Sequence, residues 1–221
     1  MAFATEEQID RRFANVSRSK TFTNIVKTLN LDTKSVLDIG CSYGEFLPHF
    51  GEGSTGVTLV QEEVDVGIAR GLDIQYGNIE SPEFSLEKKY DAIFANNIFE
   101  HLYSPHQFLR NIGQYLKSDG ILILGVPCIP KISFLLVHKK FRGSLAVAHI
   151  NFFTKETLEW TARRGGWKPF MNRGFRLKNI FLDSLLDLIY PHFYVVAHAD
   201  KDFAYSKKRM KELAGYPDVS V

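Results

Sequence analysis

The residues best suited to bind a ligand lie in a glycine turn early in the chain. Residues 35–39, Ser-Val-Leu-Asp-Ile, are typical of a short buried strand, and Gly40 and Gly44 follow in a tight turn that leads into a helix expected at 45–50. Glycine lets the backbone approach a ligand where a Cβ would block it, and the first N–H groups of a helix suit a carboxylate. The next glycines come only after the expected helix, so the spacing differs from the G-x-G-x-x-G of dinucleotide sites.

A second group of residues is suited to proton transfer. Glu100 and His101 follow an expected strand, and His149 precedes a run of aromatic residues. Histidine titrates near neutral pH, so His101 and His149 are the candidate catalytic residues, as a general base for a hydroxyl acceptor. The alternatives stay open: Glu100 and His101 would satisfy the backbone donors of a helix start, and His149 would be a core histidine. The chain has no CxxC pair, HExxH or carboxylate cluster with metal spacing, so no metal is expected.

The elements that must position these residues alternate between strands and helices. Further strands are expected at 54–60, 73–76, 90–95 and 120–126, and helices at 6–30, 61–70 and 105–116. Short apolar strands that alternate with helices indicate an α/β fold with a mostly parallel, helix-covered sheet.

The pattern changes after Pro127. Residues 129–153 are irregular and rich in apolar side chains, which is typical of a mobile cover over a site. A helix at 154–164, capped by Thr154, and strands at 167–171 and 193–198 are expected to follow. Between these strands, residues 177–189 form an amphipathic pattern, which predicts a core helix with Asp183 and Asp187 facing solvent.

Composition narrows the class of protein. Of the 221 residues, 45% are hydrophobic and 24% charged, as in an ordinary globular domain. No apolar run reaches about 18 residues, so no membrane span is expected. Two isolated cysteines, Cys41 and Cys128, make no disulfide framework, which favours a reducing, cytoplasmic location.

Charge divides unevenly along the chain. Residues 1–128 hold 11 Lys and Arg against 17 Asp and Glu, a net −6, whereas residues 129–221 hold 16 against 8, a net +8. The basic half is either a set of solvated faces or a region that favours an anionic ligand, with Arg142, Arg173 and Arg176 as candidates.

Five segments in order resemble the class I S-adenosylmethionine-dependent methyltransferases, of the small-molecule type. Residues 38–44, Asp-Ile-Gly-Cys-Ser-Tyr-Gly, resemble the family's first motif. The other four segments are 56–60, 77–79, 96–101 and 149–154. The resemblance implies a single doubly wound, mostly parallel seven-stranded sheet, Rossmann-like, with an N-terminal helical segment and a lid after strand 5. It implies one domain over 1–221: helices at 1–33, a cofactor-binding half at 34–128, and an acceptor-side lid and C-terminal half at 129–221.

The resemblance also implies S-adenosyl-L-methionine as the cofactor and places residues around it. Asp38, Gly40, Cys41, Ser42 and Gly44 would surround the methionine moiety, Asn78 and Ile79 the adenine, and Asn96 and Asn97 the sulfonium end. Thr58 stands where the family usually has an acid for the ribose hydroxyls. Thr58, Gln61 or Glu62 would substitute for it. Asn78 stands where Asp is common in the family, and its amide still bonds a purine edge.

The implied function is methyl transfer to an oxygen or nitrogen of a small molecule, with an anionic acceptor such as a nucleotide-linked sugar as one candidate. The chain lacks an Asn-Pro-Pro-Tyr signature, so a nucleic-acid target is not expected. Two alternatives stay open. One is a non-catalytic methyltransferase-like binding module, which the Thr58 departure favours. The other is an NAD-dependent oxidoreductase, against which the glycine spacing counts. The oligomeric state is not indicated.

Overall fold

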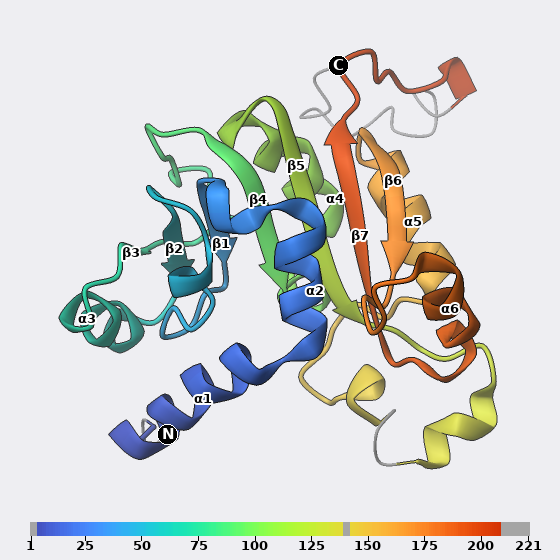
Figure 1. Ribbon diagram of the computed structural model, residues 1–221. Helices are drawn as coiled ribbons and strands as arrows, with labels where there is room; N and C mark the ends of the chain where they lie inside the picture. The colour runs from blue at the N-terminus through green and yellow to red at the C-terminus, as the bar shows by residue number, and fades with distance from the viewer. Residues whose placement is uncertain (1–3, 139–141, 209–221) are drawn as a thin grey trace.

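A seven-stranded sheet in the order β3-β2-β1-β4-β5-β7-β6 forms the frame of the protein (Figure 1). The computed structural model describes residues 4–138 and 142–208. The strands are β1 (Val36–Ile39), β2 (Thr55–Thr58), β3 (Ile74–Tyr76), β4 (Tyr90–Asn96), β5 (Leu116–Pro127), β6 (Trp167–Arg173) and β7 (His192–Ala199). β1 to β5 pair in parallel, and β7 runs antiparallel to both β5 and β6. The predicted mostly parallel, doubly wound sheet is therefore confirmed.

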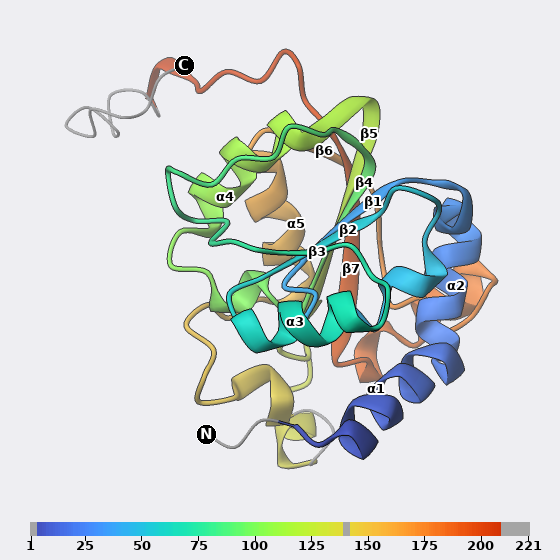
Figure 2. The same cartoon turned by 90° about the vertical axis from the view of Figure 1, so that its left-hand side faces the viewer.

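Helices cover both faces of this sheet (Figure 2). The helices are α1 (Glu6–Arg18), α2 (Lys20–Leu29), α3 (Gln61–Ala69), α4 (Pro105–Ile112), α5 (Lys155–Arg164) and α6 (Ile180–Leu185). Phe22 and Ile25 of α2 pack on one face of the sheet, and Leu109 of α4 and Leu158 of α5 pack on the other. No helix in the described ranges has the length and apolarity needed to cross a membrane.

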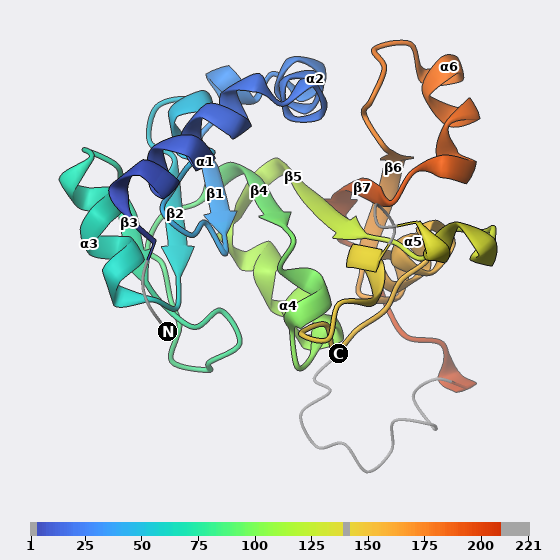
Figure 3. The same cartoon turned by 90° about the horizontal axis from the view of Figure 1, so that it is seen from below.

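Local caps explain where several of these helices begin. Thr5 and Gln8 form a reciprocal capping box at the start of α1, and Ser19 ends α1 and caps α2. Thr154 caps α5, as the sequence predicts. α1 and α2 thus form a bent pair. α2 lies on the sheet, and α1 extends toward α3 (Figures 1 and 3). Asp10 of α1 forms an ion pair at 2.8 Å with Arg70, the residue that follows α3.

The helix expected at residues 45–50 is wrong. The chain instead makes turns followed by one 3₁₀ turn, Leu47–His49. Pro48 disfavours α geometry at the residue before it and cannot donate a helix hydrogen bond. The backbone N–H of Gly51 already returns to the carbonyl oxygens of Leu31 and Lys34 at 2.9 Å, so the connection is too short for an α-helix. No helix N-terminus therefore stands behind the glycine turn to bind a carboxylate.

The orientation expected for residues 177–189 is also wrong. Asp183 is only 2% exposed, whereas apolar side chains of α6, such as Phe181 at 72%, face outward. The Asp183 carboxylate accepts hydrogen bonds from the Arg173 guanidinium at 2.8 Å and from the backbone N–H groups of Phe175 and Leu177 at 3.0 and 2.8 Å. A buried arginine needs this acid, so the polar network overrides the amphipathic pattern.

We expect Asp183→Asn to destabilise the protein strongly, because it leaves the guanidinium of Arg173 buried without a counter-charge. Breaking a buried pair in this way costs about 3–5 kcal/mol, or a fall of about 10 °C in the melting temperature of a domain of this size. Thermal unfolding followed by circular dichroism measures the change. Asp10→Asn is the matched control, because its ion pair is exposed and should contribute at most about 1 kcal/mol. Equal losses in the two variants would contradict this account.

Candidate functional site

A cavity of about 620 Å³ opens where the carboxyl ends of β1, β2 and β3 meet the chain that follows β4. It is lined by Ile39, Gly40, Ser42, Val57, Thr58, Leu59, Glu63, Gly77, Asn78, Ile79, Glu80, Ile98, His101, Leu102, Tyr103, Ser104 and Gln107. β1 lies between β2 and β4, so the chain crosses over at this point, which is where open α/β sheets bind ligands. Six residues that the sequence places in the site therefore share one cavity: Gly40, Ser42, Thr58, Asn78, Ile79 and His101.

The glycine turn adopts the backbone that the sequence predicts. Gly40 and Gly44 have φ of 73° and 81°, and Ser42 between them has φ of 50°, a conformation that costs energy in a residue with a Cβ. A Cβ at Gly40 would lie 3.1 Å from the side chain of Ile98, and at Gly44 it would lie 2.6 Å from that of Ile74. Gly40 therefore keeps the cavity open, whereas Gly44 packs beneath the turn.

Glu63 is a site residue that sequence reasoning missed. It lies in the first turn of α3, and its carboxylate accepts hydrogen bonds from the hydroxyls of Thr58 and, at 2.9 Å, Ser42. Gln61 instead bonds Asp65 at 2.8 Å, and neither Gln61 nor Glu62 lines the cavity. Its position in the sequence could have indicated this role. Glu63 comes five positions after the end of β2, so it lies in the first turn of the next helix, where its side chain can point back to the end of the strand.

Two buried carboxylates lie beneath the glycine turn. One oxygen each of Asp38 and Glu45 is buried without a hydrogen-bond partner in the described part of the chain. Burial, and then the neighbouring Glu45, raise the pKa of Asp38 well above its usual value. Glu45 also accepts a hydrogen bond from Arg12 of α1 at 2.6 Å, and Arg12 reaches the Ser42 hydroxyl at 2.9 Å. Unpartnered carboxylate oxygens fit a ligand that carries an ammonium group, as the methionine end of the expected cofactor does.

Five of the expected cofactor residues do not line the cavity: Asp38, Cys41, Gly44, Asn96 and Asn97. The Cys41 thiol is buried against Gly56, and burial raises its pKa, so it is not a nucleophile at neutral pH. Asn97, with φ of 55°, accepts a hydrogen bond from the Nε2 of His192 at 2.8 Å. Any contact of these five residues with a ligand stays a prediction.

Glu100, His101 and His149 meet beside the cavity. Glu100 is 1% exposed, and one of its carboxylate oxygens lies 3.9 Å from the Nε2 atoms of both histidines. Burial raises the pKa of Glu100 to about 7, whereas burial, followed by the charge of His101, lowers that of His149. The two candidate catalytic histidines, 48 positions apart, are thus brought together, and the structure adds a buried acid to them.

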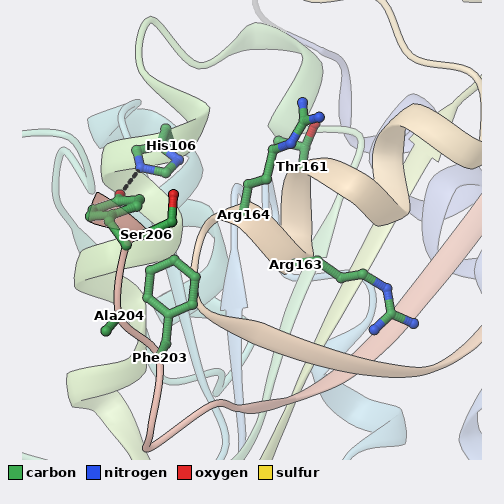
Figure 4. A pocket seen from close by; sticks show the side chains of 8 residues that line it. His106, Thr161, Arg163, Arg164, Phe203, Ala204 and Ser206 are labelled. Atoms are coloured by element: carbon green, nitrogen blue, oxygen red, sulfur yellow. Dashed lines mark hydrogen bonds between the residues drawn. The ribbon is translucent and has the colours of Figure 1, made fainter. Parts of the chain in front are cut away.

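A second cavity of about 620 Å³ lies between α4, α5 and the chain after β7 (Figure 4). It is lined by His106, Thr161, Arg163, Arg164, Phe203, Ala204, Tyr205 and Ser206. The imidazole of His106 bonds the Tyr205 hydroxyl across it. It contains none of the residues that the sequence places in a site and no carboxyl end of a parallel strand, so the first cavity is the candidate active site.

Comparison with known proteins agrees with this architecture. An S-adenosylmethionine-dependent methyltransferase from Clostridium acetobutylicum superposes with a TM-score of 0.64 at 11% identity, over 87% of this chain and 98% of that one. The fold is thus that of the class I S-adenosylmethionine-dependent methyltransferases. A family model described as a methyltransferase domain matches residues 9–170, and the chain belongs to that family.

Two curated relatives are similar over part of their length. One is an (S)-coclaurine N-methyltransferase from Papaver somniferum, 27% identical over 47% of this chain and 32% of its own. The other is a ubiquinone biosynthesis O-methyltransferase from Rickettsia canadensis, 27% identical over 46% of each chain. The chain therefore spans a third to a half of the length of these two relatives.

We expect Glu63→Gln to weaken binding of S-adenosylhomocysteine about 10- to 100-fold. The substitution removes the negative charge, and it replaces one of the two carboxylate oxygens that could accept hydrogen bonds from the ribose hydroxyls by an NH₂ group, which cannot accept. Isothermal titration calorimetry measures the affinity. Glu62→Gln is the matched control: it removes the same charge one residue earlier, outside the cavity lining, and should bind as the wild type does. If Glu62→Gln weakened binding as much as Glu63→Gln, Glu63 would not be a ribose ligand.

Proposed function

We propose that the protein transfers the methyl group of S-adenosylmethionine to an oxygen or nitrogen of a small molecule. The observation that carries this proposal is the cavity at the strand ends, because it joins a glycine turn and Glu63 on one side to His101 on the other. Glu63 and Thr58 would hold the ribose, Asn78 and Ile79 the adenine, and Asp38 with Glu45 the ammonium. The O- and N-methyltransferases among the relatives support both acceptor atoms.

The residues of the site then have distinct tasks. In the proposed reaction an O–C or N–C bond would form as the S–C bond of the bound cofactor breaks, and its electrons would stay on sulfur to give S-adenosylhomocysteine. The cofactor supplies the activated methyl group, so the protein mainly aligns the acceptor and excludes water. A hydroxyl acceptor would also have to lose its proton, and the Nε2 of His101, which lies 3.9 Å from the carboxylate of Glu100, would accept it.

We expect S-adenosylmethionine and S-adenosylhomocysteine to bind, and NAD not to bind, in calorimetric titrations. Gly40→Val should abolish the binding while circular dichroism still reports a folded chain, because its side chain enters the space beside Ile98 at a φ that favours glycine. Binding of NAD instead would indicate an oxidoreductase. Binding of S-adenosylhomocysteine without turnover of any acceptor in a broad panel would indicate a non-catalytic binding module.

An anionic acceptor, such as a nucleotide-linked sugar, is a separate proposal that rests on the basic C-terminal half. Two of its three candidate arginines can now be placed: Arg173 is buried in its pair with Asp183, and Arg176 lies exposed over the ring of Tyr190, 5.2 Å from its centroid. The side chain of Arg142 lies outside the described part of the chain. Among the described residues that line the cavity there is no Lys or Arg, so Arg176 is the candidate that stays available.

If the acceptor is anionic, its apparent affinity should fall as ionic strength rises, since salt screens exposed charges. Steady-state assays of neutral and phosphorylated acceptors at low and high salt measure this dependence. Arg176→Gln should remove it, whereas Arg163→Gln, on the distant α5, should not. Turnover of a neutral acceptor with no salt dependence would leave the charge asymmetry as a property of the solvated surface.

We further propose that residues 1–221 act as one methyltransferase domain. In this arrangement 1–33 form the helical start, 34–128 bind the cofactor, and 129–221 provide the acceptor side. Because Cys128 pairs with Phe153, the proposed cover at 129–153 starts and ends at neighbouring points, and its end is held where Ile150 and Asn151 bond the carbonyl oxygen of Glu100. Both cysteines are free and buried, which supports a cytoplasmic location.

A further inference from the structure

We propose that Glu100, His101 and His149 form a binding site for one divalent transition-metal ion. Each residue contributes one ligand atom, and these three atoms all lie within 4.8 Å of one another. Nothing in the spacing of the sequence indicated the site, because two ligands are adjacent and the third comes 48 positions later. The inference therefore departs from the expectation, drawn from the sequence, that the protein holds no metal.

The ring of His101 is oriented by a contact with the backbone. The Nδ1 of His101 lies 3.1 Å from the carbonyl oxygen of Ala148, so Nδ1 carries the proton and Nε2 keeps its lone pair toward Glu100. A metal-bound histidine is oriented by this kind of backbone contact from its other ring nitrogen. The ring of His149 stands edge-on to that of His101, with centroids 4.8 Å apart.

The position of His149 is fixed as well. The backbone N–H groups of Ile150 and Asn151 donate to the carbonyl oxygen of Glu100 at 3.1 and 3.0 Å. The side-chain amide of Asn151 donates to the carbonyl oxygen of Leu102 at 2.6 Å. The segment that carries the third ligand is thus tied to the main chain on both sides of His101, at the carbonyl oxygens of Glu100 and Leu102.

The carboxylate of Glu100 needs a partner that the described residues do not supply. One of its oxygens is buried without a hydrogen bond, and the other lies 3.9 Å from each Nε2, beyond hydrogen-bond distance. Ligand atoms around a tetrahedral ion lie about 3.4 Å apart, given bonds of about 2.1 Å. The two pairs that include Glu100 must therefore close by about 0.5 Å, and the two imidazole nitrogens, which lie within 4.8 Å of each other, by up to about 1.4 Å. Rotations of the three side chains would provide these shifts.

The donor set indicates which ions fit. Two imidazole nitrogens and one carboxylate suit Zn²⁺, Co²⁺, Mn²⁺ or Fe²⁺, whereas Ca²⁺ and Mg²⁺ prefer oxygen ligands. Three protein ligands leave further positions open, as in catalytic rather than structural sites. His101 also lines the cofactor cavity, so an open position would face the acceptor. Given the proposed function, the ion would occupy the lone pair of the His101 Nε2, so it would replace that nitrogen as the group that promotes loss of the acceptor's proton, by lowering the pKa of a bound hydroxyl.

Titration of the untagged, chelator-treated full chain with Zn²⁺ and Co²⁺ tests the site. We expect one equivalent of Zn²⁺ to bind in calorimetry and one of Co²⁺ to give a visible absorption spectrum. His101→Asn should weaken binding at least about 100-fold, since even losing a contact that orients a ligand costs 10- to 100-fold. His101 is the main variant because its side chain is 36% exposed, so its loss disturbs the core less than that of Glu100. His149→Asn should act in the same way.

His198→Asn is the matched control, because His198 is exposed on β7 and remote from the three ligands. It should bind metal as the wild type does. Zn²⁺ affinity that is unchanged in both His101→Asn and His149→Asn, or a wild-type chain that binds neither ion, would overturn the proposal. The affinity for S-adenosylhomocysteine is measured in parallel. A wild-type protein that binds Zn²⁺ but not S-adenosylhomocysteine would refute the proposed function and leave the metal site supported.

Discussion

The parallel pairing of β1 with β2 and β4 is the constraint on which the site depends. It brings the carboxyl ends of three strands to one edge of the sheet, so Gly40, Thr58 and the segment after Asn96 meet although they are far apart in sequence. β1 is buried along its whole length, so its end cannot shift without breaking both neighbouring ladders. The glycine turn is therefore held rigidly, and its strained backbone is stabilised by the sheet beneath it.

A second consequence of this rigidity is that charge is concentrated under the cavity. Asp38, Glu45 and Glu63 all lie around one short turn, and the cation of Arg12 partners only part of that charge. Burial, and then the neighbouring Glu45, disfavour ionisation of Asp38 and raise its pKa well above the usual value. A cationic ligand would stabilise these carboxylates. The cofactor fits this requirement, because its methionine end carries an ammonium group and its reacting centre is a sulfonium. The same local arrangement thus lowers stability and favours this ligand.

Much of the fold was predictable because buried parallel strands and capped helices leave local signals. The strands along the chain, the helix cap at Thr154 and the turn at Gly40 were predicted from apolar runs, a hydroxyl side chain and glycine spacing. The failures have a common cause. The helix expected at 45–50 was excluded by Pro48 and by the backbone return at Gly51, and the face of α6 was set by the buried Arg173. In each case a tertiary contact overrode a local pattern.

The site itself was predictable only where function depends on backbone. Gly40 lines the cavity as the glycine turn predicts, and Ser42 and Asn78 line it as the family resemblance implies. Glu63 was missed because a carboxylate can reach the same hydroxyls from a helix as from a strand, and only the packing of α3 decides which. The three groups at Glu100, His101 and His149 show the same limit more strongly. Their convergence depends on main-chain hydrogen bonds from Ile150 and Asn151 to Glu100, which lies 50 and 51 positions earlier in the chain. A cluster of side chains from separate segments is therefore visible only after folding, and Glu100, His101 and His149 form such a cluster.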